Sequence, residues 1–259
     1  MANITAKDVA ELRKKTGCGM MDCKRALVEA DGNRDEAVKI LREKGLAKAA
    51  KKAGRIAAEG IVKAKVNGTN GVIVEINCET DFCAKSDKFL ELVETITDTI
   101  LANDAADVEA LKNCTIAGGA QTVSEYMTEK IATIGENMNI RRFEQVKEEN
   151  GFIASYIHAG GKIGVLVDVE TDVINDDIKE MAKNLAMQAA ALKPLYTSRD
   201  EVDADYIEKE KEILMVQAKN EKPDANEKIL NGMVMGRINK ELKEICLLDQ
   251  VYVKAEDGK

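Results

Sequence analysis

Two glycine-containing turns, the first also rich in asparagine, constrain the fold of this chain most strongly. Each separates two runs of strand-forming residues: residues 67–71 lie between Ile61–Val66 and Val72–Cys78, and residues 159–161 lie between Phe152–His158 and Ile163–Glu170. This arrangement predicts two antiparallel β-hairpins. Helical periodicity follows each hairpin, so we predict two half-domains with one plan, repeated in architecture and not in sequence.

The scarcity of aromatic residues indicates how the core is built. Aromatics make up 3% of the 259 residues and Trp is absent, so the core must come from Ala, Val, Ile, Leu and Met. A core of this kind favours helices packed on small sheets over a β-sandwich. The chain is long enough for more than one module, and we predict an α+β fold.

Residues 1–54 are predicted to form a module of three short helices with a linker. Thr5 and Asp8 cap the first helix, which ends at Gly17. The second runs from about Met21 to Ala30, and Asn33 caps the third. We expect the third helix to end at Gly45 and residues 48–54 to be a helical or flexible linker. The predicted core residues are Val9, Leu12, Leu27, Ala37, Ile40 and Leu41.

The remaining periodic segments complete the predicted architecture. Helices are expected over residues 89–100, 123–134 and 178–192, with Gly135 and Pro194 marking two of the ends, and a strand is expected over 139–146. The last of these helices should bury Ile178, Met181, Ala182, Leu185, Ala186 and Leu192. Two polar helices, 201–222 and 224–246, should form an antiparallel hairpin that projects from the body. Its predicted seam comprises Ile213, Leu214, Leu230, Val234, Ile238, Leu242 and Ile245.

These elements predict four segments. They are the three-helix module (1–54), the amino-terminal half of the core (55–147), the carboxy-terminal half (148–198) and the helical hairpin or coiled coil (199–245). Residues 246–259 are a candidate to complete the second half of the core, because 247–253 have the composition of a strand.

Charge is unevenly distributed along the chain. Residues 1–55 hold 14 Lys and Arg against 8 Asp and Glu, a net of +6, whereas the whole chain carries −8, which leaves −14 on the rest. The basic module is suited to an acidic protein surface or RNA, but the acidic body argues against the chain tracking a nucleic acid. No apolar run is long enough to span a membrane and no signal peptide opens the chain, so we expect a cytoplasmic protein.

The usual signatures of enzymes are missing. There is no phosphate-binding loop, and His158, the one histidine, has no nucleophile elbow beside it. Cys18 and Cys23, like Cys78 and Cys83, have four intervening residues, which is marginal for a zinc site. Buried, inert thiols are the prediction, with no metal and no cofactor.

Thr80-Asp81-Phe82 is the most unusual local feature, because it places a carboxylate and an aromatic ring side by side at a predicted strand-to-helix junction. Such a pair could act on a partner's metal or phosphate site while the ring separates the partner's helices. The alternative is structural: Phe82 would be a core residue and Asp81 a helix cap. From these residues alone the structural alternative is favoured.

Three motifs resemble the elongation factor Ts family. They are Leu12–Leu27 (LRKKTGCGMMDCKRAL), Glu75–Phe82 (EINCETDF) leading to Ala84-Lys85, and Ile134–Arg142 (IGENMNIRR) combined with His158–Leu166 (HAGGKIGVL). They occur in the family's order, and the resemblance covers essentially the whole chain. It implies a module similar to ubiquitin-associated domains, two α+β half-domains and a protruding helical hairpin.

The resemblance also implies a function, that of a guanine nucleotide exchange factor for elongation factor Tu. Asp81 and Phe82, within the segment Thr80–Cys83, would insert near the partner's Mg²⁺ site and weaken the binding of GDP. The helical hairpin would be a further contact or a self-association element. No covalent chemistry of its own is implied.

Further contacts with the partner follow from matching family positions. Met20, Met21 and Lys24 match the amino-terminal contact region, and the two adjacent methionines suit an adaptable contact. Ile134 and Gly135 match a contact near the inserted pair. His158 matches a contact that helps to displace the phosphate-binding loop.

The sequence departs from the family pattern at two places. Cys83 stands where the family commonly has Val after Asp-Phe. The family also normally continues beyond Leu247–Gln250 into a last strand and a helical module, whereas this chain stops at Lys259. We therefore expect the second half-domain to lack its third strand and to leave an open sheet edge.

Three functions are compatible with these observations. The first is nucleotide exchange on elongation factor Tu. The second is a non-exchange adaptor that binds ubiquitin-like or nascent-chain partners through the three-helix module. An enzyme using His158 ranks last, because the nucleophile motif is missing.

Overall fold

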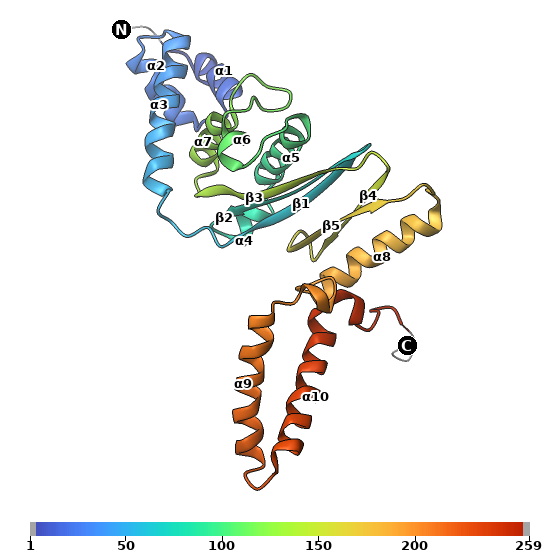
Figure 1. The fold of residues 1–259 in the computed structure, drawn as a ribbon. Coiled ribbons are helices and arrows are strands. Elements are labelled where there is room, and N and C mark those ends of the chain that lie inside the picture. Colours follow the sequence, from blue (N-terminus) through green and yellow to red (C-terminus); the bar gives the residue numbers. More distant parts are fainter. Residues whose placement is uncertain (1–3, 256–259) are drawn as a thin grey trace. The chain divides into compact units, whose positions relative to one another are not determined.

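The computed structural model describes residues 4–255, and its first three helices form the amino-terminal module (Figure 1). They are α1 (Ala6–Thr16), α2 (Met20–Glu29) and α3 (Arg34–Lys52). The predicted caps are confirmed: Thr5 and Asp8 form a reciprocal capping box, and Gly17 ends α1 in the left-handed conformation. The small core of the module comprises Val9, Leu12, Cys23, Ala26, Leu27, Ala37 and Leu41.

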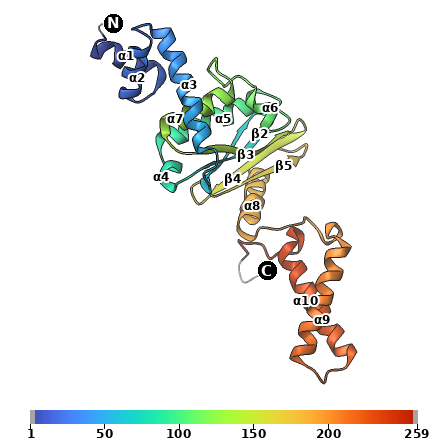
Figure 2. The same cartoon turned by 90° about the vertical axis from the view of Figure 1, so that its left-hand side faces the viewer.

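The predicted end of the third helix is wrong. α3 continues through Gly45 to Lys52, because Gly45 keeps a helical backbone and is buried. A Cβ atom at Gly45 would lie 3.6 Å from the Cβ of Ala132 in α7 (Val123–Ile134). This is an ordinary van der Waals distance, so α3 and α7 are in contact at Gly45, and Figure 2 shows α3 running beside that helix. Gly45 is thus a packing residue and not a helix stop.

A three-stranded antiparallel sheet follows the module, in the order β1-β2-β3. The strands are β1 (Glu59–Asn67), β2 (Asn70–Cys78) and β3 (Met138–Lys147). The first predicted hairpin is confirmed, with Asn67 paired to Asn70 across the turn. A bulge between Glu75 and Ile76 shifts the register against β3.

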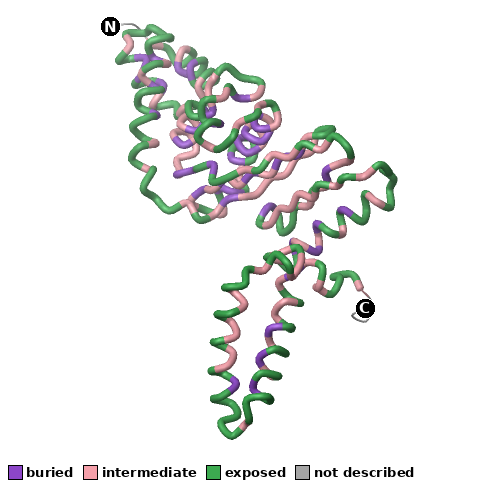
Figure 3. The backbone as a smooth tube through the Cα atoms, in the orientation of Figure 1, coloured by how far each residue is buried: buried purple, intermediate pink, exposed green. Residues whose placement is uncertain are grey.

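Helices cover one face of this sheet (Figure 1). They are α4 (Asp81–Ala84), α5 (Asp87–Ala102), α6 (Val108–Lys112) and α7. Alternate residues of β2 point at them, and Figure 3 shows buried positions gathering between the sheet and α5. The main core includes Val72, Val74, Ile76, Phe89, Leu92, Val93, Ile96 and Ile100.

The second predicted hairpin, β4 (Gly151–His158) and β5 (Ile163–Glu170), forms a separate two-stranded sheet. It packs on the face of β1 and β2 that the helices leave free. A Cβ atom at Gly164 would lie 2.5 Å from Cγ1 of Val62, so the glycine permits this close contact. The amide of Val62 donates a 2.6 Å hydrogen bond to the carbonyl of Gly161.

Residues up to 174 form one compact unit, and those from 175 onward form a second. The second contains α8 (Asp176–Leu192), the short 3-10 helices η1 (Arg199–Glu201) and η2 (Leu247–Asp249), α9 (Ala204–Glu221) and α10 (Glu227–Ile245). α9 and α10 pack side by side through Ala218, Leu230, Val234 and Ile238. Ile213 was predicted to lie in this seam but is exposed.

Two other expectations for the second unit are wrong. In α8, Ala182 and Ala186 are buried as predicted, whereas Met181, Leu185 and Leu192 are exposed. The expected strand over 247–253 is not formed within the described residues: the segment begins as η2. Beyond η2, the buried side chain of Gln188 accepts from the amide of Val253 and donates to the carbonyl of Val251. The Gln188 side chain thus forms hydrogen bonds with backbone groups of residues 251 and 253 that would be paired with a neighbouring strand if this segment were part of a sheet.

The described residues combine helices with two small antiparallel sheets, so the predicted α+β class is confirmed. Among residues 4–255, no helix combines the length and the apolar composition needed to cross a membrane.

Candidate functional site

The junction between β2 and α4 places Phe82 at the surface. Thr80 has extended backbone and caps α4, since its hydroxyl oxygen accepts a 3.1 Å hydrogen bond from the amide of Cys83. Asp81 is therefore the first residue of the helix, and the Phe82 side chain on the next position is 83% exposed. The alternative with a buried Phe82 and a capping Asp81 is wrong.

Glu136, which follows α7, holds this junction from across the fold. Its Oε2 accepts hydrogen bonds from the amides of Glu79 and Thr80, both at 3.0 Å, and its Oε1 accepts one from the Thr80 hydroxyl at 2.6 Å. In return, the carboxylate of Glu79 accepts from the amide of Asn137 at 2.6 Å. The segment that presents Phe82 is thus fastened to the turn between α7 and β3.

Asp81 lies beside Phe82 with its carboxylate partly exposed. The ammonium group of Lys85, one helical turn later, donates to Asp81 Oδ2 at 2.8 Å. This hydrogen bond lowers the pKa of Asp81 from its ordinary value. The exposed surface of the junction therefore carries a charged carboxylate and an aromatic ring on adjacent positions.

Ile134 and Gly135 lie next to this junction, as the motifs imply. Gly135 ends α7 in the left-handed conformation, with φ of 93°, and the chain turns there into Glu136. Both residues are half-buried. Glu136 itself was not among the predicted site residues: it stood within a quoted motif, and a glycine-ended helix followed by Glu was the available signal.

His158 belongs to the same end of the structure. It lies at the end of β4, exposed, with Nδ1 2.9 Å from the hydroxyl of Tyr156. The turn that follows it is tied to β1, because Lys162 donates to Glu59 at 2.5 Å. Glu59 pairs with Cys78, the last residue of β2. The β4–β5 turn and the Thr80–Cys83 segment therefore lie at one end of the main sheet.

Met20, Met21 and Lys24 lie on α2, away from the sheet. Both methionine side chains are well exposed, at 54% and 61%, and Lys24 is exposed as well. Two large apolar side chains on adjacent exposed positions are available to a partner. The structure thus places the predicted contact residues in two groups, one on the module and one at the end of the sheet.

A family model described as Elongation factor TS matches residues 79–259, starting one residue before Thr80. The chain belongs to the elongation factor Ts family. Elongation factor Ts of Clostridium botulinum (strain Alaska E43 / Type E3) is 52% identical over 257 residues, which cover 98% of this chain and 84% of the relative. Elongation factor Ts of Clostridioides difficile (strain 630) is 52% identical over 259 residues, covering 99% and 84%. The resemblance predicted from the motifs is confirmed.

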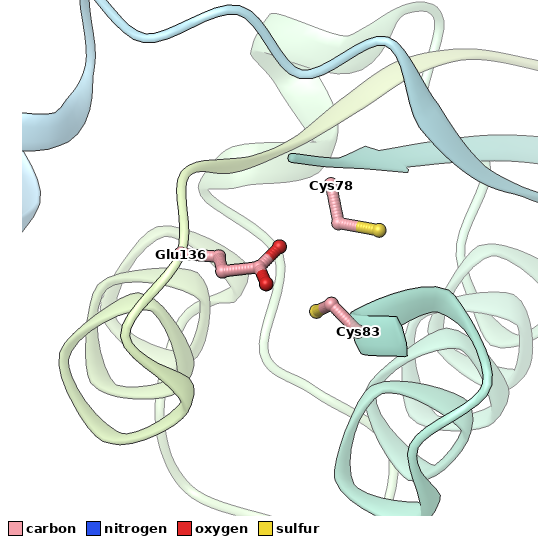
Figure 4. Close-up of side chains that lie close together, drawn as sticks. All are labelled: Cys78, Cys83 and Glu136. Atoms are coloured by element: carbon pink, nitrogen blue, oxygen red, sulfur yellow. The ribbon is translucent and has the colours of Figure 1, made fainter. Parts of the chain in front are cut away.

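In this member of the elongation factor Ts family, two buried thiols lie under the exposed junction. Cys78 ends β2 and Cys83 lies in α4, and their Sγ atoms and one carboxylate oxygen of Glu136 all lie within 4.8 Å of one another (Figure 4). Burial raises the pKa of both thiols, so they are protonated at neutral pH. In the other pair, Cys23 is buried and Cys18 half-buried. The spacing of the cysteines did not indicate that Glu136 lies beside Cys78 and Cys83, because Glu136 is 53 residues beyond Cys83.

Proposed function

We propose that this member of the elongation factor Ts family is a guanine nucleotide exchange factor that binds elongation factor Tu with GDP and promotes GDP release during translation elongation. The observation that carries this proposal is the exposure of Phe82 beside the charged Asp81 on a segment fastened by Glu136. An exposed aromatic ring on an ordered support is available for burial in a partner.

The proposed mechanism is insertion. Phe82 enters between helices of the partner's GTPase domain, and Asp81 comes close to the Mg²⁺ site. A GTPase holds its nucleotide mainly through phosphates and Mg²⁺, so displacing either weakens GDP. A factor that binds the nucleotide-free partner better than the GDP-bound partner must weaken GDP by the same factor.

The energies required are within reach of a binding event. A thousandfold faster release needs a barrier lower by about 4 kcal/mol. Burying the Phe82 ring on the partner supplies about 1.5–3 kcal/mol, and the disturbed metal and phosphate contacts supply the remainder. No covalent step and no cofactor is part of this mechanism, so the protein acts as a binding factor and not as an enzyme.

The other exposed residues extend the contact. We assign Ile134, Gly135 and His158 to the surface around Thr80–Cys83, supported by their position at one end of the main sheet. Met20, Met21 and Lys24 form a separate contact on the module. We assign the helical pair α9–α10 to a further contact with the partner or to self-association. We expect the protein to carry out nucleotide exchange in the cytoplasm.

The test is release of fluorescently labelled GDP from purified elongation factor Tu. Replacing Asp81 and Phe82 together by Ala should lower the stimulated rate at least about 10-fold, the equivalent of losing 1.4 kcal/mol of burial. The matched control is Leu248→Ala, which removes another exposed apolar side chain and should leave the rate unchanged. An undiminished rate in the double variant would refute the insertion mechanism, and binding without any effect of the native chain on GDP would favour an adaptor.

A further inference from the structure

Three side chains from three separate elements converge beneath the Thr80–Phe82 segment. Cys78 comes from the end of β2, Cys83 from α4 and Glu136 from the turn after α7. Figure 4 shows the three side chains close together, and their ligand atoms lie within 4.8 Å of each other. Cys78 is 0% and Cys83 is 6% exposed, so the two sulfur atoms are shielded from bulk water.

The Glu136 carboxylate and the Thr80 carbonyl, which lie near the two thiols, have lone pairs that could bind a metal ion. Glu136 Oε2 accepts two amide hydrogens and Oε1 accepts the Thr80 hydroxyl, and the Cys83 thiol also interacts with this carboxylate through a proton that a metal ion would replace. A carboxylate oxygen has two lone-pair positions, so Oε1 can bind a cation while keeping its hydrogen bond. The carbonyl oxygen of Thr80 lies 3.2 Å from Cys78 Sγ and accepts a 3.1 Å hydrogen bond from the amide of Ala84, so its second lone pair offers a fourth ligand.

We propose that Cys78, Cys83 and Glu136 form a binding site for a thiophilic divalent cation of the Zn²⁺ class. Two sulfur and two oxygen ligands suit a four-coordinate zinc ion. With Zn–S bonds of about 2.3 Å, the ligand atoms of a tetrahedral site lie roughly 3.5–3.8 Å apart. The three side chains therefore need to close by about 1 Å at most, a movement that small side-chain rotations can supply.

Binding replaces protons by the metal. Two S–H bonds break, two metal–sulfur bonds form and two protons pass to solvent, while Glu136 binds as the carboxylate it already is. Two thiolates and a carboxylate packed together would repel one another without a cation, and the divalent ion removes that repulsion. A disulfide between the two cysteines would need an oxidant, and the structure supplies none.

The metal would join the three elements that hold Phe82: the end of β2, α4 and the turn between α7 and β3. It would thus stabilise the segment against local opening by mass action. Metal binding at this site does not depend on nucleotide exchange, so either proposal can fail without the other.

The experiment is a Co²⁺ titration of the full chain, reduced with a phosphine and free of other metals. We expect one equivalent to produce a thiolate-to-cobalt charge-transfer band and the visible bands of tetrahedral cobalt, with two protons released per metal in weakly buffered solution. Added Zn²⁺ should bleach these bands. Cys83→Val, which keeps an apolar side chain of similar size, and Cys83→Ser, which keeps the shape, should each abolish them.

The matched control is Cys18→Val, which alters the other pair of cysteines with the same spacing and should leave the cobalt spectrum unchanged. Circular dichroism checks that each variant is folded. Absence of the charge-transfer band in the native chain, its persistence in both Cys83 variants, or its loss in Cys18→Val would overturn the site. A Cys78–Cys83 disulfide, found by mass spectrometry in chain that takes up no metal after reduction, would overturn it too.

Discussion

The carboxylate of Glu136 binds both the backbone amide and the side-chain hydroxyl of Thr80, at 3.0 and 2.6 Å, although 56 residues separate the two in sequence. Thr80 is in turn the cap of α4, which carries Phe82. The position of the exposed ring thus depends on a residue of the distant α7–β3 turn. Local sequence around Phe82 is not sufficient to hold it.

Glu136→Gln should loosen this segment while preserving size. The amide group places an N–H where the carboxylate accepted a hydrogen bond, so one or two donors of Glu79 and Thr80 lose their partner. We expect the free energy of unfolding to fall by about 1–3 kcal/mol, and amide hydrogen exchange at Glu79 and Thr80 to accelerate. Glu109→Gln, which alters an exposed surface ion pair, is the control and should change little. Unchanged exchange at both amides would show that Glu136 is dispensable for the segment.

Phe82 in α4 and Phe89 near the start of α5 should differ sharply in their effect on stability. Phe82 is 83% exposed and Phe89 is 0% exposed. Phe89→Ala leaves a cavity in the core and should cost about 3–5 kcal/mol, whereas Phe82→Ala should stay within about 0.5 kcal/mol of the native chain. Urea unfolding followed by circular dichroism measures both. A large loss in Phe82→Ala would mean that the ring packs on its own protein.

Replacing glycine by alanine should change stability in opposite directions at Gly232 and at Gly60. Gly232 is in the interior of α10 with open space around it, so Gly232→Ala should raise stability by about 0.5–1 kcal/mol. Gly60 has φ of 135°, and a Cβ there would lie 2.2 Å from the carbonyl oxygen of Ile76, so Gly60→Ala should cost about 1–3 kcal/mol. Thermal unfolding of the two variants in parallel is the measurement. Equal shifts would contradict the backbone geometry of β1.

The capping box of α1 should give the module a pH dependence. Hydrogen bonds from Thr5 and Arg34 lower the pKa of Asp8 from 3.8 to about 2. Because the folded pKa is the lower one, the stabilisation by Asp8 is fully present above its unfolded pKa of about 4 and declines as the pH falls toward 2. Asp8→Asn should therefore destabilise the chain at about pH 6 and much less near pH 2. Denaturant unfolding across this range measures the difference.

A companion variant checks the cause of that shift. Arg34→Met removes the guanidinium that donates to Asp8 at 2.7 Å, so the pKa of Asp8 should rise and its contribution should be lost at a higher pH. A stability difference between Asp8→Asn and the native chain that stays constant from about pH 6 to pH 2 would contradict the assignment.

Local sequence features were sufficient to predict the helices and strands whose ends are set by turns and caps. The asparagine- and glycine-rich turn after Asn67 predicted the first β-hairpin, and Thr5 with Asp8 predicted the start of α1. These features act over a few residues, so they can be recognised without knowledge of the fold. The strands of the second hairpin were predictable for the same reason.

Features that depend on distant neighbours were not predictable. A glycine such as Gly45 is typical of a helix end, but in the structure Gly45 lies inside α3 and packs against Ala132 on α7. Ile213 fits a helical seam by periodicity, yet α9 packs on α10 through Ile207, Leu214, Met215 and Ala218, and Ile213 is exposed. Glu136 had no assigned role, because its hydrogen-bond donors are more than fifty residues away.

The continuity of α3 through Gly45 has a consequence for the evolution of chain length. Leu41 belongs to the core of the module, and Gly45, one turn later, meets α7. One residue inserted between them would rotate the module about the helix axis by about 100° and shift it by about 1.5 Å. Met20 and Met21 would then face another direction relative to the main sheet. The number of residues in this turn is therefore under constraint even where their identity is not.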